Sequence, residues 1–490
     1  MADTLSLLPF SFWVVIALLV GGTFWARLHL RGGLGLPVFA VLGTVAAWYV
    51  GDAFYNDYRT TYAIMFTPDV RSYAWWQVAL FLATFLFLVG EIHRYMNRRI
   101  LSRPSQIFLM VDNGTALSPF QEGLQRLFWG CLAIWGVLAV IAAMRLQGET
   151  IYYFFPYLSY RADPWARGRI GTGFDSLLSF AMYLQIMVAV MFGITAALVR
   201  DRRIRILAFI ACALIWPYFL FDRTRNVMLA ILLPSILSWV FMRLRVVMWQ
   251  KFAILACFFL VINAWFAFVV VHRSTMTVTE ALMSEGFDLE EESTIHHQGL
   301  NMFEELCWLN TFFENGTYQP NWGTEYFAEI VNPIPRSLWT GKPLIGIDYA
   351  ILRGQGYDEG DAGVGATIST GLIGQGVDNF GRYLGPPFAA LLMAFWVAYL
   401  ARMDLFGQGL GRIPLYGLGL ILTFNLGRDI TLITLYTFVF GRLLVWMLDQ
   451  AELKRAVQNQ RSTVASGKKP ASASRPASPS PSPLSSTGAK

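Results

Sequence analysis

Arginine side chains occur in three short segments between apolar stretches of this chain, and their chemistry suits a phosphate ligand. Residues 220–227 read L-F-D-R-T-R-N-V and contain Arg223 and Arg225, a second segment contains Arg273, and the sequence N-L-G-R-D contains Arg428. The guanidinium group is planar, always charged and able to donate to two oxygens at once. These three segments are therefore candidates for binding a phosphate or pyrophosphate group.

The composition is that of a membrane protein. Of the 490 residues, 55% are hydrophobic and 14% are charged, whereas soluble proteins carry about a quarter charged residues. The net charge of +6 indicates contact with anionic membrane lipid, and the sequence shows no pattern typical of nucleic-acid binding. The four cysteines lack a C-x-x-C spacing and no D-x-D cluster occurs, so we expect no metal and no other cofactor.

The sequence predicts an all-α polytopic membrane protein with about eleven transmembrane helices. Each apolar segment is close to the length that crosses a ~30 Å hydrocarbon core as a helix. The predicted helices are 8–26, 34–52, 75–92, 127–144, 176–199, 204–221, 227–242, 252–271, 384–401, 413–426 and 430–448.

Basic residues in the short loops predict the orientation, because such loops stay in the cytoplasm. Arginine and lysine gather in the loops after the first, third, fifth, seventh and ninth helices. The N-terminus, whose first helix lacks the features of a cleaved signal peptide, is then exterior. The predicted organisation is helices one to eight in residues 1–271, a large exterior loop in 272–383, helices nine to eleven in 384–450 and a disordered cytoplasmic tail in 451–490.

This orientation puts all three arginine segments on the exterior side, where the positive-inside rule makes arginine scarce. Arg223 could pair with Asp222 and Arg428 with Asp429, or the side chains could extend to the interface at little cost. We favour ligand binding because three separate segments repeat the pattern.

The end of the large exterior loop is rich in glycine. Residues 363–385 read G-V-G-A-T-I-S-T-G-L-I-G-Q-G-V-D-N-F-G-R-Y-L-G, which has too many glycines for an ordinary spanning helix and is too apolar for a free loop. Irregular backbone at membrane depth is tolerated where it lines a cavity. We therefore expect a re-entrant or cavity-lining segment here.

Three motifs carry a family resemblance. N-P-I-P-R-S-L-W-T-G-K-P at 332–343, I-G-Q-G-V-D-N-F-G-R-Y-L-G at 373–385 and N-L-G-R-D at 425–429 resemble the Wzy-type oligosaccharide repeat-unit polymerases of bacteria. The resemblance covers about residues 220–440 and includes the late exterior loop. Gln375 stands where the family often has glutamate.

The resemblance implies an architecture like that of the lipid-dependent, GT-C-like glycosyltransferases. It implies an enzyme of the bacterial inner membrane that polymerises undecaprenyl-pyrophosphate-linked oligosaccharide units into O-antigen, capsule or exopolysaccharide at the outer face. The implied partners are this lipid-linked substrate, membrane lipid, a flippase and a chain-length regulator.

Such a reaction requires cations for the pyrophosphate leaving group and a base for the attacking hydroxyl. The shortlist for the base is His272, His296, His297, Glu304, Glu305 and Asp378. The predicted catalytic residues are Arg223, Arg225, Arg273, Arg428, His297 and Asp378, and the predicted substrate-binding residues are Arg336, Lys342, Asn379, Arg161, Arg167, Arg169 and Tyr153. The aromatic residues of loop 151–169 fit an interfacial belt better than a sugar site, but the arginines among them keep glycan contact open.

Two other functions share parts of this pattern. An O-antigen ligase uses the same donor and differs in its acceptor. A lipid-linked oligosaccharide flippase, which is not an enzyme, should carry charges along the inner wall of its helices. Apart from Arg442, no charged residue lies near the middle of a predicted span, and this counts against transport.

We predict that Arg223→Ala or Arg428→Ala abolishes long-chain glycan, because each removes a cation from the leaving group. Gel analysis of surface glycan measures chain length, and immunoblotting of membranes checks that the protein is present. Normal chain length in both variants would contradict the phosphate-binding role.

Overall fold

The computed structural model describes most of the chain and shows an all-helical protein. It describes residues 7–30, 32–56, 58–99, 117–165, 178–221, 225–271, 301–332, 334–335, 338–343, 346–354, 368–403 and 412–465. Within these ranges no β-strand is present. The chain forms two compact units, Met1–Val445 and Trp446–Lys490, and the sites described below lie in the first.

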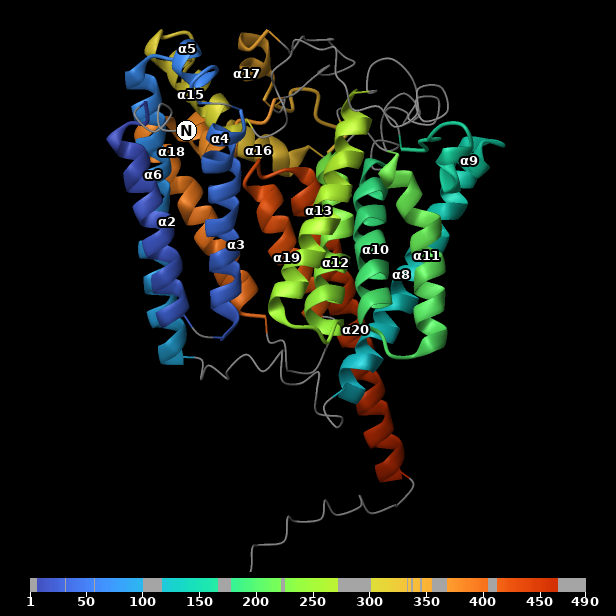
Figure 1. Ribbon diagram of the computed structural model, residues 1–490. Helices are drawn as coiled ribbons and strands as arrows, with labels where there is room; N and C mark the ends of the chain where they lie inside the picture. Colours follow the sequence, from blue (N-terminus) through green and yellow to red (C-terminus); the bar gives the residue numbers. More distant parts are fainter. Residues whose placement is uncertain are drawn as a thin grey trace, which may run out of the picture. The chain divides into compact units, whose positions relative to one another are not determined.

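The helices follow the apolar segments of the sequence (Figure 1). The α-helices are α2 (Phe10–His29), α3 (Gly35–Val45), α4 (Asp52–Tyr55), α5 (Tyr62–Met65), α6 (Pro68–Arg99), α8 (Leu117–Leu146), α9 (Thr150–Phe154), α10 (Ser179–Leu198), α11 (Arg202–Leu220), α12 (Arg225–Ser238), α13 (Met248–Val271), α15 (Met302–Glu314), α16 (Thr324–Val331), α17 (Ile347–Leu352), α18 (Leu372–Ala401), α19 (Arg412–Leu426) and α20 (Leu432–Ala465). Short 3-10 helices are η1 (Gly32–Leu34) and η3 (Pro156–Leu158), and π-helical turns are η2 (Ala46–Gly51) and η6 (Trp239–Arg243).

In the part of the chain that the structure describes, eight helices are long and apolar enough to cross a membrane, as in a multi-pass membrane protein. Three further apolar helices, Val227–Arg243, Met248–Ile262 and Arg412–Leu426, are shorter. They coincide with three of the predicted spans, but the predicted count of eleven is not confirmed. The short helices α15, α16 and α17 gather at one end of the long helices, which we call the loop-side end (Figure 1).

Small residues let the long helices approach closely. A Cβ atom on Gly193 of α10 would come within 2.6 Å of Trp216 of α11, and one on Gly427 would come within 2.5 Å of Trp48. Between membrane helices, van der Waals contact between close backbones replaces much of the hydrophobic driving force. Gly193 and Gly427 thus mark two of the tight contacts that hold the helices together.

The segment α18 is a hairpin of two helices rather than one straight rod. Gly381 has φ 76° and ψ 178°, a backbone conformation outside the helical region. A Cβ on Gly376 would lie 3.0 Å from the Cβ of Ala389 and closer still to the carbonyl oxygen of Gly385. In a straight helix Gly376 and Gly385 would be about 13 Å apart. The chain therefore reverses at Gly381, and residues 372–380 form a short helix folded back on the long one.

Three hydrogen bonds attach this short helix to its neighbours. Leu372 N–H donates to the carbonyl of Gly427 at 3.1 Å, and Ile373 N–H donates to the Tyr49 hydroxyl at 2.9 Å. Gln375 Oε1 accepts from the N–H of Ile430 at 3.1 Å. The first two bonds satisfy N–H groups that have no partner inside the short helix. The glycine-rich segment expected to be re-entrant is thus a short helix held by η2 and by the turn between α19 and α20.

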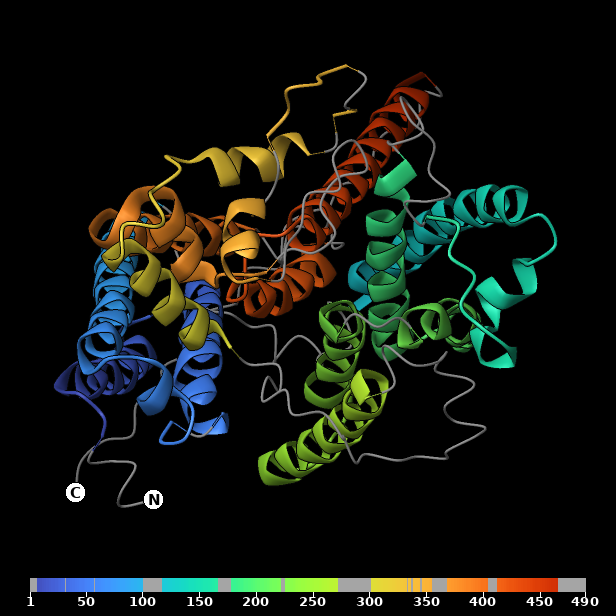
Figure 2. The ribbon, with the colours of Figure 1, turned by 90° about the horizontal axis from the view of Figure 1, so that it is seen from above.

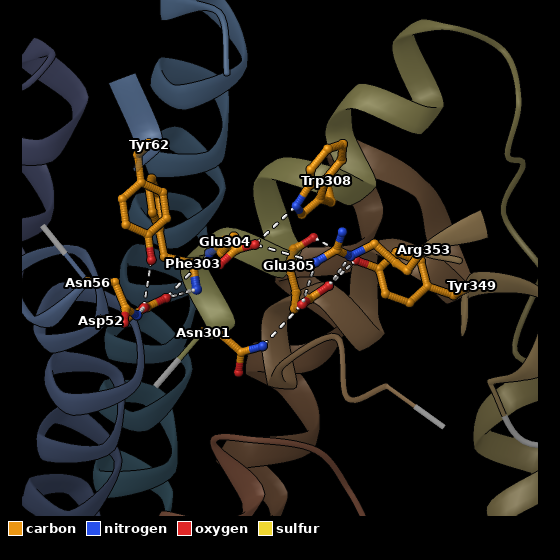
Figure 3. Close-up of polar contacts among 10 residues, drawn as sticks. All are labelled: Asp52, Asn56, Tyr62, Asn301, Phe303, Glu304, Glu305, Trp308, Tyr349 and Arg353. Carbon is orange, nitrogen blue, oxygen red and sulfur yellow. Dashed lines mark hydrogen bonds and ion pairs between the residues drawn. The ribbon is translucent and has the colours of Figure 1, made fainter. Parts of the chain in front are cut away.

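The first helix of the long loop, α15, is anchored by a carboxylate from another part of the chain. Asp52 accepts hydrogen bonds from the backbone N–H groups of Phe303 at 2.6 Å and Glu304 at 3.3 Å (Figure 3). The same carboxylate accepts from Tyr62 at 2.7 Å and Asn56 at 2.5 Å. A helix N-terminus presents free N–H groups and partial positive charge, which a carboxylate satisfies. Asp52 therefore acts as the N-terminal cap that Asn301 does not provide.

The other end of this network fixes α17. Arg353 donates to Glu305 at 3.0 Å and pairs with Glu304 at 3.4 Å, while its guanidinium lies 4.6 Å from the ring centre of Trp308. Tyr349 donates to the carboxylate of Glu305 (Figure 3). Seen from above, residues 301–354 lie around the start of α18 (Figure 2). Both glutamates on the shortlist for the base are thus ion-paired parts of the scaffold.

We predict that Gly376→Ala lowers the free energy of unfolding by about 1–3 kcal/mol, because the added methyl group overlaps the backbone of the facing helix. Gly417→Ala in α19 is the matched control, since a Cβ there meets nothing within 4 Å; it should be neutral or stabilise by up to about 1 kcal/mol. Thermal unfolding of the purified protein measures both. Equal stability of the two variants would contradict the hairpin contact.

Candidate functional site

Four buried carboxyl groups meet at the loop-side end, and we call them the acid cluster. Glu325 and Glu329 come from α16, Asp378 comes from the short helix of the α18 hairpin, and Asp429 comes from the turn between α19 and α20. Each is between 1% and 8% exposed. Within the first unit, three chain segments that are far apart in sequence therefore place acids side by side.

Glu325 and Asp378 form the closest pair. Burial and the charge of Asp378 hold the pKa of Glu325 well above its ordinary range, and the two side chains share a hydrogen bond. Two close carboxyl groups in a buried place keep one proton between them, because both cannot ionise. Asn379 Nδ2 lies 3.3 Å from Glu325 Oε2 and donates to it.

The Asp378 carboxylate is oriented by two donors from the segment that joins α15 and α16. Tyr318 donates its hydroxyl proton to Oδ1 at 2.7 Å, and Asn321 Nδ2 donates to the same oxygen at 3.0 Å. The backbone N–H of Asn321 also donates to the Asp378 carbonyl at 3.1 Å. No N–H or hydroxyl of the described residues donates to Oδ2, which is buried.

Asp429 and Glu329 form the second pair. Burial raises the pKa of Asp429 to about 7, although a hydrogen bond with Ser369 and the charge of Arg428 oppose the rise. Burial and the charge of Asp429 raise the pKa of Glu329 to about 8. Carboxyl groups with pKa values near 7 can both take and release a proton at neutral pH. Asp378 also acts on Asp429, so the two pairs form one electrostatic unit.

Several buried polar atoms around the acid cluster have no hydrogen-bond partner among the described residues. They are Asn321 Oδ1, Tyr326 OH, Glu329 Oε2, Asn379 Oδ1, Asn425 Nδ2 and Asp429 Oδ1. Buried polar atoms in folded proteins are almost always hydrogen-bonded, and exceptions mark functional sites. A polar ligand with several hydroxyl groups would satisfy such a set. The described residues contain no group of three or more His, Cys, Asp or Glu side chains arranged to hold a metal ion.

Three of the predicted site residues come together here. Asp378 and Asn379 lie in the α18 hairpin, and Arg428 follows α19 with its Nε donating to Ser369 Oγ at 2.8 Å. The charge of Arg428 lowers the pKa of Asp429, as expected for adjacent opposite charges. Gln375, at the position where the resembling family often has glutamate, accepts from the Ile430 backbone and has a structural role.

Arg161 and Tyr153 lie outside the acid cluster, in the segment between α8 and α10. Arg161 pairs with Asp163 at 3.2 Å and lies over the ring of Tyr218, while the Tyr218 hydroxyl donates to Asp163 at 2.7 Å. Tyr153 is 2% exposed, and its ring centre lies 5.1 Å from that of Tyr218. These contacts hold the loop after α8 to α11. Tyr153 therefore has no free face on which a sugar could stack.

The remaining predicted residues divide into one anchored side chain and a group that is not described. Lys342 Nζ donates to the carbonyls of Asn332 at 2.6 Å and Ile334 at 2.9 Å, which closes the loop after α16. Arg225 begins α12, but its side chain lies outside the described part of the structure. Arg167, Arg169, Arg223, Arg273, His297 and Arg336, with His272 and His296 of the shortlist, also lie outside the described residues.

Sequence reasoning missed Glu325 and Glu329 and assigned Asp429 only to local pairing. No sequence motif distinguishes these acids from the other glutamates of the same loop. One usable signal was present: Glu325 and Glu329 are four residues apart, so they lie on one face of a helix that also carries apolar residues.

Comparison of the chain with protein-family models, with curated proteins and with solved structures finds no match in any of the three. A functional assignment therefore depends on the chemistry of the chain itself.

We predict that Glu329→Gln removes part of the pH dependence of stability. The pKa of Glu329 is about 8 in the folded protein and near 4.5 when unfolded, so the folded state binds the proton more tightly. Its stability is then highest below pH ~4.5 and falls as the pH rises to ~8, by on the order of 4 kcal/mol. The variant should lose this pH dependence, and it should be more stable than wild type at pH 8.

Melting temperatures at pH 5 and pH 8 measure this effect. Glu122→Gln in α8, whose side chain is 59% exposed, is the control and should leave the slope unchanged. A wild-type slope that persists in Glu329→Gln would show that Glu329 does not titrate in this way.

Proposed function

We propose that this protein is a multi-pass membrane glycosyltransferase that polymerises undecaprenyl-pyrophosphate-linked oligosaccharide units. The reaction would take place at the outer face of the bacterial inner membrane, on a GT-C-like architecture, and yield a surface polysaccharide. One observation carries the proposal: an oriented, proton-sharing carboxyl pair, Glu325 and Asp378, lies in the same electrostatic cluster as Arg428.

Asp378 is the proposed general base. A base must be held in place by a second group, and Tyr318 and Asn321 do this for Oδ1. Oδ2 then accepts the proton of the attacking sugar hydroxyl. The hydroxyl oxygen bonds to the anomeric carbon of the donor, the bond from that carbon to the pyrophosphate breaks, and its electron pair leaves with the pyrophosphate.

Arg428 is the proposed stabiliser of the leaving group. It is half-buried, and it lies beside Asp429 at the loop-side end. A fixed guanidinium stabilises the negative charge that develops on the pyrophosphate without reorganising. Arg223, Arg225, Arg273 and Arg336 stay part of this proposal as further cations.

The turn above Asp378 supports a carbohydrate ligand. Trp322 is 73% exposed and has φ 52°, a left-handed conformation that is rare for a bulky residue. It directly follows Asn321, which holds Asp378. Strained backbone is often kept at functional sites, and an indole face offers a flat apolar surface to a sugar ring. Since Asp378 is 1% exposed, the acceptor would have to displace this turn to reach the base.

A flippase is the second candidate, and the α18 hairpin favours it. Transporters often bind their substrates at broken helices, and buried protonatable carboxyls can couple proton movement to transport. Asp378 lies in the short arm of the α18 hairpin, and this segment is broken at Gly381. The shortage of charge in the predicted spans is therefore a weaker argument against transport than the sequence indicated.

We predict that Asp378→Asn lowers the rate of polymer formation by about 10²-fold or more, the usual effect of losing a general base. The amide keeps the hydrogen bond with Tyr318 but cannot take a proton. Asp69→Asn is the control, because Asp69 is exposed at the start of α6, and it should keep full activity. Purified protein, with a lipid-linked repeat unit as both donor and acceptor, gives the rate directly.

The same assay separates the candidates. Polymer made by purified protein in detergent, where no membrane can be crossed, would exclude a flippase as the sole function. Deletion of the gene should leave surface glycan with single repeats. Free, unattached polymer would indicate a ligase, and lipid-linked units that accumulate in the cytoplasm would indicate a flippase.

A further inference from the structure

Arg71, in the first turn of α6, is a buried cation that forms no ion pair with a described residue. The residue is 6% exposed, and its Nε and Nη1 atoms are buried without a hydrogen-bond partner among the described residues. Its guanidinium lies 5.4 Å from the ring centre of Tyr58. A buried charge is normally paired or hydrogen-bonded. Contact with one aromatic face does not meet the hydrogen-bonding needs of this group.

Two more polar groups point to the same place without finding partners. The Tyr58 hydroxyl and the Trp75 indole Nε1 are both buried and unpartnered within the described structure. Trp75 is four residues after Arg71 and lies on the same face of α6. The Tyr58 hydroxyl lies beside both side chains, because burial raises the pKa of Tyr58 while the charge of Arg71 and the N–H groups of Trp75 and Arg71 lower it.

The described neighbours of Arg71 do not supply an anion. Trp75 is stacked on Phe303 with ring centres 4.0 Å apart, and Phe303 also packs on Tyr58. Across α15, Cys307 is affected by the charges of Arg71, Asp52 and Glu304. Those two carboxylates are already used by the donors of the α15 network. The group thus consists of hydrogen-bond donors and one positive charge enclosed by aromatic rings.

We propose that Arg71, Tyr58 and Trp75 form a binding site for a phosphate-type oxyanion at the loop-side end of α6. Three N–H donors and one hydroxyl can each meet an oxygen of such a group, and its negative charge neutralises the guanidinium. This site is separate from the acid cluster and does not depend on the proposed glycosyl transfer. Because α6 is a candidate span that begins at Pro68, Arg71 lies near the level of lipid headgroups, so the oxyanion can come from a lipid or from free phosphate.

The test uses full-length protein purified in maltoside detergent, which contains no phosphate. Thermal unfolding is followed with inorganic phosphate and, at the same ionic strength, with chloride. A second arm adds phosphatidylglycerol to the micelles and no inorganic phosphate. The variants are Arg71→Met, which keeps the apolar bulk, and Tyr58→Phe, which removes one hydroxyl. Arg59→Gln changes a neighbouring but exposed cation and is the matched control.

We expect phosphate, but not chloride, to raise the melting temperature of wild type and Arg59→Gln. Arg71→Met should lose this rise and unfold no earlier than wild type when phosphate is absent. Tyr58→Phe should need about tenfold more phosphate for half of the effect, the loss of one hydrogen bond to a charged group. If phosphatidylglycerol alone raises the melting temperature of wild type, and Arg71→Met loses this rise too, the oxyanion comes from a lipid headgroup.

Three results would overturn the proposal. One is equal stabilisation by phosphate and chloride. Another is a phosphate or phosphatidylglycerol effect that persists in Arg71→Met. The third is a wild-type protein that responds to neither phosphate nor phosphatidylglycerol, which would leave Arg71 with only its contact to Tyr58.

Discussion

The contact between Gly376 and Gly385 is the constraint on which the acid cluster depends. The chain reverses at Gly381, where φ is 76°, and the two arms of α18 then touch through backbone atoms that only glycine leaves uncovered. This reversal turns Asp378 and Asn379 toward α16 and brings Gln375 to the turn after α19. Any side chain at Gly376 would separate the two arms of α18. Asp378, Asn379 and Gln375 would then all be displaced from their present positions.

Burial gives the cluster its chemical character. A carboxyl group in water ionises near pH 4, but desolvation penalises the charged form, and the pKa values of Asp429 and Glu329 rise to about 7 and about 8. Like charges nearby add to the rise, and Arg428 opposes it. The result is a set of acids that can exchange protons at neutral pH, a property useful to a glycosyltransferase and to a transporter alike.

A second set of contacts keeps α15 and α17 in place. The Asp52 carboxylate caps α15, and Arg353 joins α15 to α17 through two glutamates. These charged groups are satisfied by their neighbours, which is the mark of a scaffold. The contrast with Arg71 is informative, because that cation is also buried and has aromatic neighbours, but its Nε and Nη1 atoms have no hydrogen-bond partner among the described residues.

The sequence alone determined the helical membrane class, because hydropathy is a local property and each apolar segment forms its helix without distant partners. It also indicated unusual structure in the glycine-rich segment, and it named Asp378 and Arg428 as candidates, which the fold brings to the acid cluster. Only the tertiary structure decided which acids meet, since Glu325 and Asp429 are about a hundred residues apart and no local pattern connects them. Burial, which raises their pKa values, likewise exists only once α16, the hairpin and the α19–α20 turn have packed together.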